Sequence, residues 1–177
     1  MFVVRCVVPL LVLLVPVLAQ AEVSSGPKES EKVAPLKVFA VTGDPKDKEV
    51  DYAELRQDKP TIYVFVSAKD FDRPMFRYMK KLAEDLGDDG LLVAVWLTDD
   101  ADKSQAYLPK ISQYFEKAAL TVHKGVSGPQ NWGINLDARL TAVTAYKGQV
   151  IKSFGYVSLN ETDVPAVIES LKTAIKK

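Results

Sequence analysis

Apolar and polar positions follow two different periods along the chain, and this pattern predicts an α/β fold. Continuous apolar runs rich in β-branched and aromatic residues occupy residues 61–66 and 91–97, as expected of strands that are buried on both faces. Between these runs, apolar residues recur at spacings of four, three and four, which predicts a helix over residues 72–86. The apolar stripe of this helix consists of Met75, Met79, Leu82 and Leu86.

Shorter patterns predict the remaining elements. We expect strands at residues 36–41, 120–122, 140–146 and 150–156, with Lys147-Gly148 as a hairpin turn between the last two. A short helix is predicted to start over residues 50–55. Another is predicted over 99–117, with an inner face formed by Tyr107, Ile111, Tyr114 and Phe115. A final helix capped by Thr162 is predicted to reach about Ile175.

The order of these elements is β-α-β-α-β-α-β-β-α. Alternating strands and helices favour parallel pairing in the first part, and the final hairpin adds antiparallel strands. The expected architecture is therefore α/β, with a central mixed β-sheet flanked by helices.

The first residues have the pattern of a secretory signal peptide. Arg5 precedes an apolar stretch that runs to Leu18, and Ala19-Gln20-Ala21 is an A-x-A cleavage site. We expect residues 1–21 to be removed, which leaves an exported protein, periplasmic or secreted, without membrane insertion. The alternative is an uncleaved anchor, although prolines interrupt the apolar stretch. Residues 22–35, rich in Ser, Pro, Glu and Lys, predict a flexible linker before one domain over 36–177.

The count of reactive side chains excludes several chemistries. The only cysteine is Cys6, inside the predicted signal peptide, so the mature chain has no thiol for disulfide exchange or metal binding. The single histidine excludes a multi-histidine metal site. With 23 basic and 23 acidic residues and no basic run between aromatics, nothing favours a nucleic-acid partner. We expect neither a metal nor a cofactor.

Several stretches resemble the thioredoxin superfamily, specifically its redoxin (peroxiredoxin-like) branch. They are a lead-in at residues 48–56 before the strand at 59–65, the segment Trp132-Gly133-Ile134-Asn135, and the strand and glycine over 140–148. The resemblance covers residues 36–175. It implies a thioredoxin-like fold, with a Trp-Cys-Gly-Pro-Cys redox motif at the start of the helix after the central strand.

This chain departs from the family pattern at that motif. The matching stretch is Phe71-Asp72-Arg73-Pro74-Met75, where Asp72 and Met75 stand in place of the two cysteines. The position of the family's cis-proline falls at Leu140, followed by Thr141, so that proline is lost as well. Disulfide exchange and peroxide reduction both begin at a thiolate. We therefore expect no thiol oxidoreductase activity and assign no catalytic residue.

Two interpretations of Asp72 follow. A carboxylate at a helix start is most often an N-cap, and this is the favoured interpretation. The alternative is a new site in which Asp72 acts with Asp70 and Arg73. Met75 is interpreted as the first core residue of its helix, and His123 as a surface or loop residue rather than a catalytic base.

Two further polar motifs have structural interpretations. Asp99, Asp100 and Asp102 suit the start of a helix, because Gln105 and Ile111 occupy positions where a calcium loop needs Gly and Glu. Asn160-Glu161-Thr162 is an N-glycosylation sequon, but we favour a helix start here.

The favoured function is a non-catalytic binding or scaffold protein whose partner is an exported protein or peptide. The expected binding groove lies near Phe71, Arg73 and Pro74 on one side and Leu140 and Thr141 on the other. One alternative is an enzyme of unrecognised type that uses a carboxylate at the former redox motif. Another is an accessory protein of a redox pathway whose thiols come from a partner.

Overall fold

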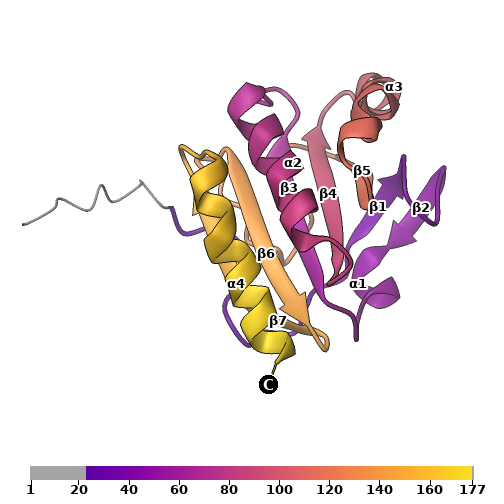
Figure 1. The fold of residues 1–177 in the computed structure, drawn as a ribbon. Coiled ribbons are helices and arrows are strands. Elements are labelled where there is room, and N and C mark those ends of the chain that lie inside the picture. The colour runs from indigo at the N-terminus through magenta and orange to yellow at the C-terminus, as the bar shows by residue number, and fades with distance from the viewer. Residues whose placement is uncertain (1–22, 177) are drawn as a thin grey trace, which may run out of the picture.

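A seven-stranded mixed sheet forms the centre of the computed structural model, which describes residues 23–176 (Figure 1). Its strand order is β2-β1-β5-β4-β3-β6-β7, with β3, β4 and β5 parallel and the other pairs antiparallel. The strands are β1 (Lys37–Ala40), β2 (Lys48–Asp51), β3 (Thr61–Ser67), β4 (Leu91–Thr98), β5 (Ala118–Lys124), β6 (Leu140–Tyr146) and β7 (Gln149–Tyr156). The predicted mixed sheet with flanking helices is confirmed.

The three longer helices cover one face of this sheet. They are α2 (Arg73–Leu86), α3 (Ala101–Ile111) and α4 (Val164–Ile175), with the 3-10 turns η1 (Ser112–Tyr114) and η2 (Glu161–Asp163) beside them. Buried residues from α2, α3 and α4 join one face of the sheet in a single apolar cluster. Apolar burial of this kind supplies most of the stability of such helices.

The opposite face is covered mainly by irregular chain and the short α1 (Tyr52–Leu55). Trp132 is fully buried there, with its ring 5.0 Å from that of Tyr63 and 4.9 Å from that of Phe65. The indole N–H of Trp132 donates to the carbonyl of Pro35, 3.1 Å away. The loop before β6 and the segment before β1 therefore close this face together.

The segment predicted as a flexible linker is part of this cover. Val23 N–H donates to the Gly155 carbonyl, Ser30 N–H donates to the Val150 carbonyl, and Val150 N–H donates to the Glu31 carbonyl. A side chain at Gly155 would collide with the carbonyl oxygen of Val23. The structure thus differs from the prediction over residues 23–35, because backbone pairing with an edge strand holds a segment that has few large apolar residues.

Several element boundaries also differ from the prediction. The strand β2 was not predicted, and the first helix begins at Tyr52 because Asp51 caps it. The inner face of α3 consists of Ser104, Leu108 and Ile111, whereas Tyr107 and Tyr114 are exposed, so their predicted burial is wrong. The final helix α4 starts at Val164, after η2, rather than from a Thr162 cap.

The predicted signal peptide lies outside the described residues. Within residues 23–176, no helix has the length and apolar character needed to cross a bilayer.

Candidate functional site

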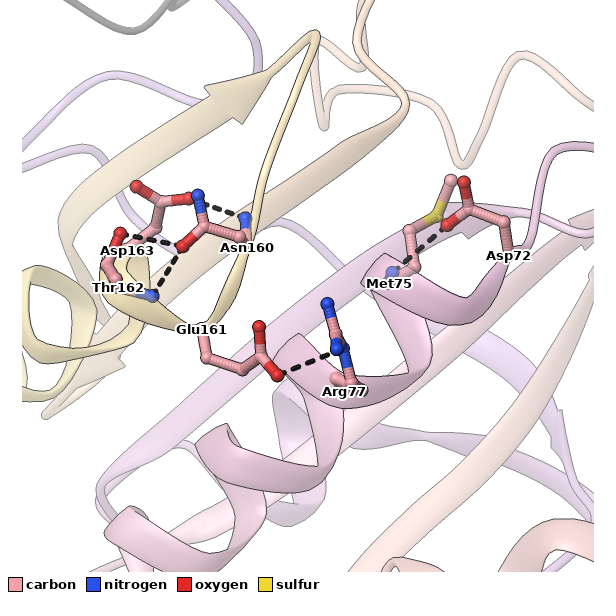
Figure 2. A network of polar contacts seen from close by, with 7 residues as sticks. All are labelled: Asp72, Met75, Arg77, Asn160, Glu161, Thr162 and Asp163. Carbon is pink, nitrogen blue, oxygen red and sulfur yellow. Dashed lines mark hydrogen bonds and ion pairs between the residues drawn. The ribbon is translucent and has the colours of Figure 1, made fainter. Parts of the chain in front are cut away.

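The stretch 71–75 leads into α2 and forms the start of its first turn, a few residues after the carboxyl end of β3. Asp72 is the N-cap of α2: its backbone is extended, and its Oδ1 accepts a hydrogen bond from the N–H of Met75 at 3.1 Å (Figure 2). Pro74 follows in the first turn, where its missing N–H leaves no helix hydrogen bond unmade. The local sequence therefore accounts for both the start and the direction of the helix.

The second oxygen of Asp72 is held by Arg139, a residue that sequence reasoning missed. Arg139 Nη2 lies 2.7 Å from Asp72 Oδ2 and 3.1 Å from the carbonyl oxygen of Asp70. The backbone N–H of Arg139 donates to the carbonyl of Tyr156, which fixes the residue at the start of β6. The available signal was a basic residue directly before Leu140, at the end of the loop that faces the former redox motif.

The charge of Asp72 is stabilised by these contacts. Partial burial raises the pKa of Asp72, but hydrogen bonds from Arg139 and from the N–H of Met75, together with the Arg139 charge, outweigh it. The net effect lowers the pKa below the ordinary 3.8. Asp72 is therefore an ionised cap whose oxygens already have partners, and it has no free proton to donate near neutral pH.

Met75 and two of the predicted groove residues, Leu140 and Thr141, turn inward. Met75 is fully buried in the helix-covered core, as expected of the first residue of the α2 stripe. Leu140 and Thr141 are buried as well, and Thr141 Oγ1 lies 2.6 Å from Ser25 Oγ. These side chains offer no surface to a partner, so the expectation that they line a groove is wrong. The N-terminal segment occupies part of the space that the prediction left to a ligand.

The alternative of an enzyme that uses Asp70, Asp72, Arg73 or His123 would gain support if these residues surrounded one pocket. His123 lies on β5 opposite Leu97 of β4. Burial lowers the pKa of His123, and hydrogen bonds with the backbone at Gly128 and Lys37 oppose this shift. None of these four residues lines the cleft described next.

An apolar cleft lies on the other side of Phe71, at the carboxyl ends of β3 and β4. It has a volume of about 450 Å³, and its floor and walls include Phe71, Trp96 and Tyr107, with Val126 at the rim. The ring of Phe71 packs 5.0 Å from that of Trp96 and 6.5 Å from that of Tyr107, both edge-on. The carboxyl ends of parallel strands are where open α/β sheets bind ligands. Phe71, the aromatic residue of the former motif, lines this cleft.

The remaining polar motifs have structural partners. Asp100 caps α3 by accepting a hydrogen bond from the N–H of Lys103 at 3.0 Å. Asn160 Oδ1 accepts hydrogen bonds from the N–H and Oγ1 of Thr162, and Asp163 completes a capping box with the Asn160 N–H (Figure 2). Among residues 23–176, no group of three or more His, Cys, Asp or Glu side chains is placed to hold a metal ion.

Comparison with solved structures places this geometry in a known fold. A protein described as the thiol:disulfide interchange protein DsbE from Chlorobium tepidum superposes with a TM-score of 0.66 at 13% identity, covering 84% of this chain and 99% of that one. Peroxidoxin BcpB from Mycobacterium tuberculosis gives 0.59 at 14% identity, covering 83% and 97%. The exposed lipoprotein thioredoxin Etrx1 from Streptococcus pneumoniae gives 0.54 at 12% identity, covering 78% and 100%.

No family model matches the sequence, and no curated protein matches it either. The likeness at these identities concerns the fold alone. The chain therefore has a thioredoxin-like fold, as the sequence resemblance implied, and its described residues carry no cysteine. Within this fold class it is a degenerate form, with an aspartate–arginine ion pair at the start of α2.

Proposed function

We propose that this chain is an exported, non-catalytic binding protein that has a thioredoxin-like fold and no thiol redox activity of its own. The observation that carries the proposal is that the side chains at the N-terminus of α2 are either buried or already paired within the chain. Asp72 caps the helix and pairs with Arg139, while Met75 is buried. No side chain there is left to act as a nucleophile, and the helix start is occupied by an internal carboxylate.

The apolar cleft beside this closed position supports a binding role. Half-exposed aromatic side chains around a concave surface are typical of sites that take an apolar group from a partner. The A-x-A sequence at residues 19–21 supports export, which makes an exported protein or peptide the proposed partner.

The negative half of the proposal is tested by a disulfide-reduction assay. Residues 22–177 are purified and incubated with insulin and dithiothreitol, beside a thioredoxin that has both cysteines. We expect insulin to precipitate at the rate of the buffer control. Acceleration by this chain in repeated preparations would contradict the proposal, because the mature sequence holds no thiol.

The binding half is tested by site-specific photo-crosslinking in the native exported fraction. A photoreactive amino acid replaces Val126, which is 45% exposed at the cleft rim, and in the matched control it replaces Leu136, which is 69% exposed. We expect a discrete adduct from position 126 and none from position 136. Equal labelling at both positions, or none at position 126, counts against a partner in the cleft.

A further inference from the structure

The cleft beside Phe71 holds two polar groups that have no partner within the described chain. Trp96 is 1% exposed and Ser104 is 6% exposed, and both line this cleft of about 450 Å³. Within residues 23–176, the indole N–H of Trp96 and the hydroxyl of Ser104 take part in no hydrogen bond. Polar groups buried to this extent normally have a partner. The two groups are therefore hydrogen-bonding positions that the chain itself leaves open.

Both open groups face the cleft rather than a sealed interior. Neither the indole nitrogen of Trp96 nor the hydroxyl oxygen of Ser104 is closed off from solvent, and the cleft is the hollow that these residues line. Their neighbours differ. The other indole, that of Trp132, donates to a backbone carbonyl. The hydroxyl of Thr98, also in the cleft, donates to the carbonyl of Asp100 and accepts from its N–H.

The apolar walls of the cleft favour an aromatic occupant. The ring of Phe71 lies 5.0 Å from that of Trp96 and 6.5 Å from that of Tyr107, both edge-on. Aromatic rings prefer such edge-on and offset contacts with one another, at centroid distances of about 4.5–7 Å. A volume of about 450 Å³ is at the lower end of the range for ligand sites. The cleft therefore suits one ring-bearing group rather than a whole helix or strand.

The charged side chains of the cleft cancel one another. Lys69 and Lys103 line it on the basic side, and Asp99 and Asp100 on the acidic side. Asp100 is already occupied as the cap of α3, because its Oδ1 accepts the N–H of Lys103 at 3.0 Å. A balanced set of charges offers no net attraction to an anion or a cation. The cleft therefore complements a neutral occupant.

The type of the open groups narrows the occupant further. An indole N–H only donates, so the occupant must bring a hydrogen-bond acceptor to Trp96. The hydroxyl of Ser104 both donates and accepts. Among neutral aromatic side chains, those of Phe and Trp carry no acceptor, whereas the hydroxyl of Tyr accepts and donates. An occupant without such a group would displace water and leave the polar atoms of the cleft unpaired.

We propose that this cleft binds a tyrosine side chain of a partner polypeptide. The ring packs among Phe71, Trp96 and Tyr107, and its hydroxyl oxygen accepts a hydrogen bond from the Trp96 indole. The Ser104 hydroxyl is a second polar contact for the occupant. The cleft opens beside Val126, which is 45% exposed, so a chain that carries the tyrosine continues past the rim. This inference rests on the proposed binding function and adds the group that the cleft takes.

The test observes the two indole N–H groups separately by NMR. The chain has two tryptophans, so the ¹⁵N-labelled protein over residues 22–177 gives two indole signals, and Trp96→Phe assigns them. The protein is titrated with a five-residue peptide of Gly and Ser that has Tyr at its centre. We expect the Trp96 signal to move downfield as its N–H gains an acceptor. The Trp132 signal should stay in place, because this N–H already donates to the Pro35 carbonyl.

Peptides that differ only at the central residue test the chemistry of the occupant. With Phe at the centre the ring is kept and the acceptor is lost, and we expect binding about tenfold weaker than with Tyr. With Leu at the centre both are lost, and binding should be at least as weak as with Phe. Free p-cresol tests a small phenol as the source. We expect it to bind at least about threefold more weakly than the Tyr peptide, because it lacks the flanking backbone.

Removal of one hydroxyl from the protein makes the test specific for the cleft. Ser104→Ala is expected to weaken binding of the Tyr peptide by about threefold or more and to leave binding of the Phe peptide unchanged. The matched control is Ser112→Ala, because the Ser112 hydroxyl donates to the Pro109 carbonyl at 2.9 Å and does not line this cleft. The dispersion of the amide signals shows that each variant is folded.

Four outcomes overturn the inference. They are an unchanged Trp96 signal with the Tyr peptide, equal affinity for the Tyr and Phe peptides, the same loss in the Ser112 control, and binding of p-cresol as tight as that of the Tyr peptide. The proposed function is decided separately by the crosslink from position 126 and by the insulin assay, since neither depends on which group fills the cleft. A crosslinked partner without tyrosine selectivity would retain that function and remove this inference.

Discussion

The surroundings of Phe71 differ between its two sides: polar groups are paired within the chain on one side, and aromatic surface is exposed on the other. On the side of β6, Asp72 and Arg139 satisfy each other, and Met75 lies inside the core. On the side of α3, Tyr107 remains 39% exposed over a cleft. Thiol enzymes of this fold keep a reactive group accessible at the start of this helix. In this chain the corresponding side chains are paired or buried, and the exposed cleft lies between Phe71 and α3 instead.

This contrast separates stability from recognition. Groups whose partners lie within the chain contribute to folding, whereas groups that lack internal partners are available to another molecule. Substitutions on the closed side should therefore change the free energy of unfolding, and substitutions on the open side should change binding with little effect on unfolding.

The largest effect is expected at Met75. Its side chain is fully buried against the sheet, so Met75→Ala leaves a cavity and should lower the free energy of unfolding by about 2–5 kcal/mol. Urea denaturation followed by circular dichroism measures the loss. Met75→Leu, a swap of similar volume, is the control and should cost less than about 1.5 kcal/mol. Equal tolerance of Ala and Leu would place Met75 outside the core.

The next largest effect is expected at Asp72. Asp72→Ala removes the helix cap and the ion pair with Arg139, and we expect a loss of about 1–2 kcal/mol in unfolding free energy. A double-mutant cycle with Arg139→Ala isolates the pair. Because both side chains are more than a third exposed, at 37% and 38%, the coupling energy should be below about 1 kcal/mol. A coupling of several kcal/mol would mean that the pair is far better shielded from solvent.

Substitutions of the exposed tyrosines Tyr107 and Tyr114 should affect folding less. Tyr107→Ala and Tyr114→Ala each remove a half-exposed ring, and we expect unfolding free energies within about 1 kcal/mol of the parent protein. Variants that unfold readily would remove the distinction between the two sides of Phe71.

The smallest effect is expected from the titration of Asp72. Its pKa is lowered in the folded protein, so ionised Asp72 adds stability that is fully present above the unfolded pKa of about 4. This contribution is lost as the pH falls below about 4 and through the folded pKa. The difference in unfolding free energy between the parent and Asp72→Asn should therefore shrink as the pH is lowered from 6 toward 2. A difference that stays constant over this range would show that the carboxylate charge adds nothing.

The roles of the residues at the start of α2 could be predicted from the local sequence. An aspartate before an Arg-Pro pair and an apolar stripe predicts a capped helix, and Asp72, Pro74 and Met75 have those roles in the structure. The exposed positions of Tyr107 and Tyr114 did not follow, because an aromatic residue with helical spacing fits an inner face equally well until the packing of α3 is known.

The sequence by itself determined that this chain has an α/β fold and that residues 22–177 contain no cysteine, because composition and apolar periodicity are properties of the chain alone. Only the tertiary structure decided that Arg139 pairs with Asp72 across 67 positions, that Val23, Ser30 and Glu31 pair with β7, and that Tyr107 and Tyr114 remain exposed beside α2. The physical reason is that long-range pairing depends on which strand edges and helix faces the sheet brings together, and no local pattern encodes that choice.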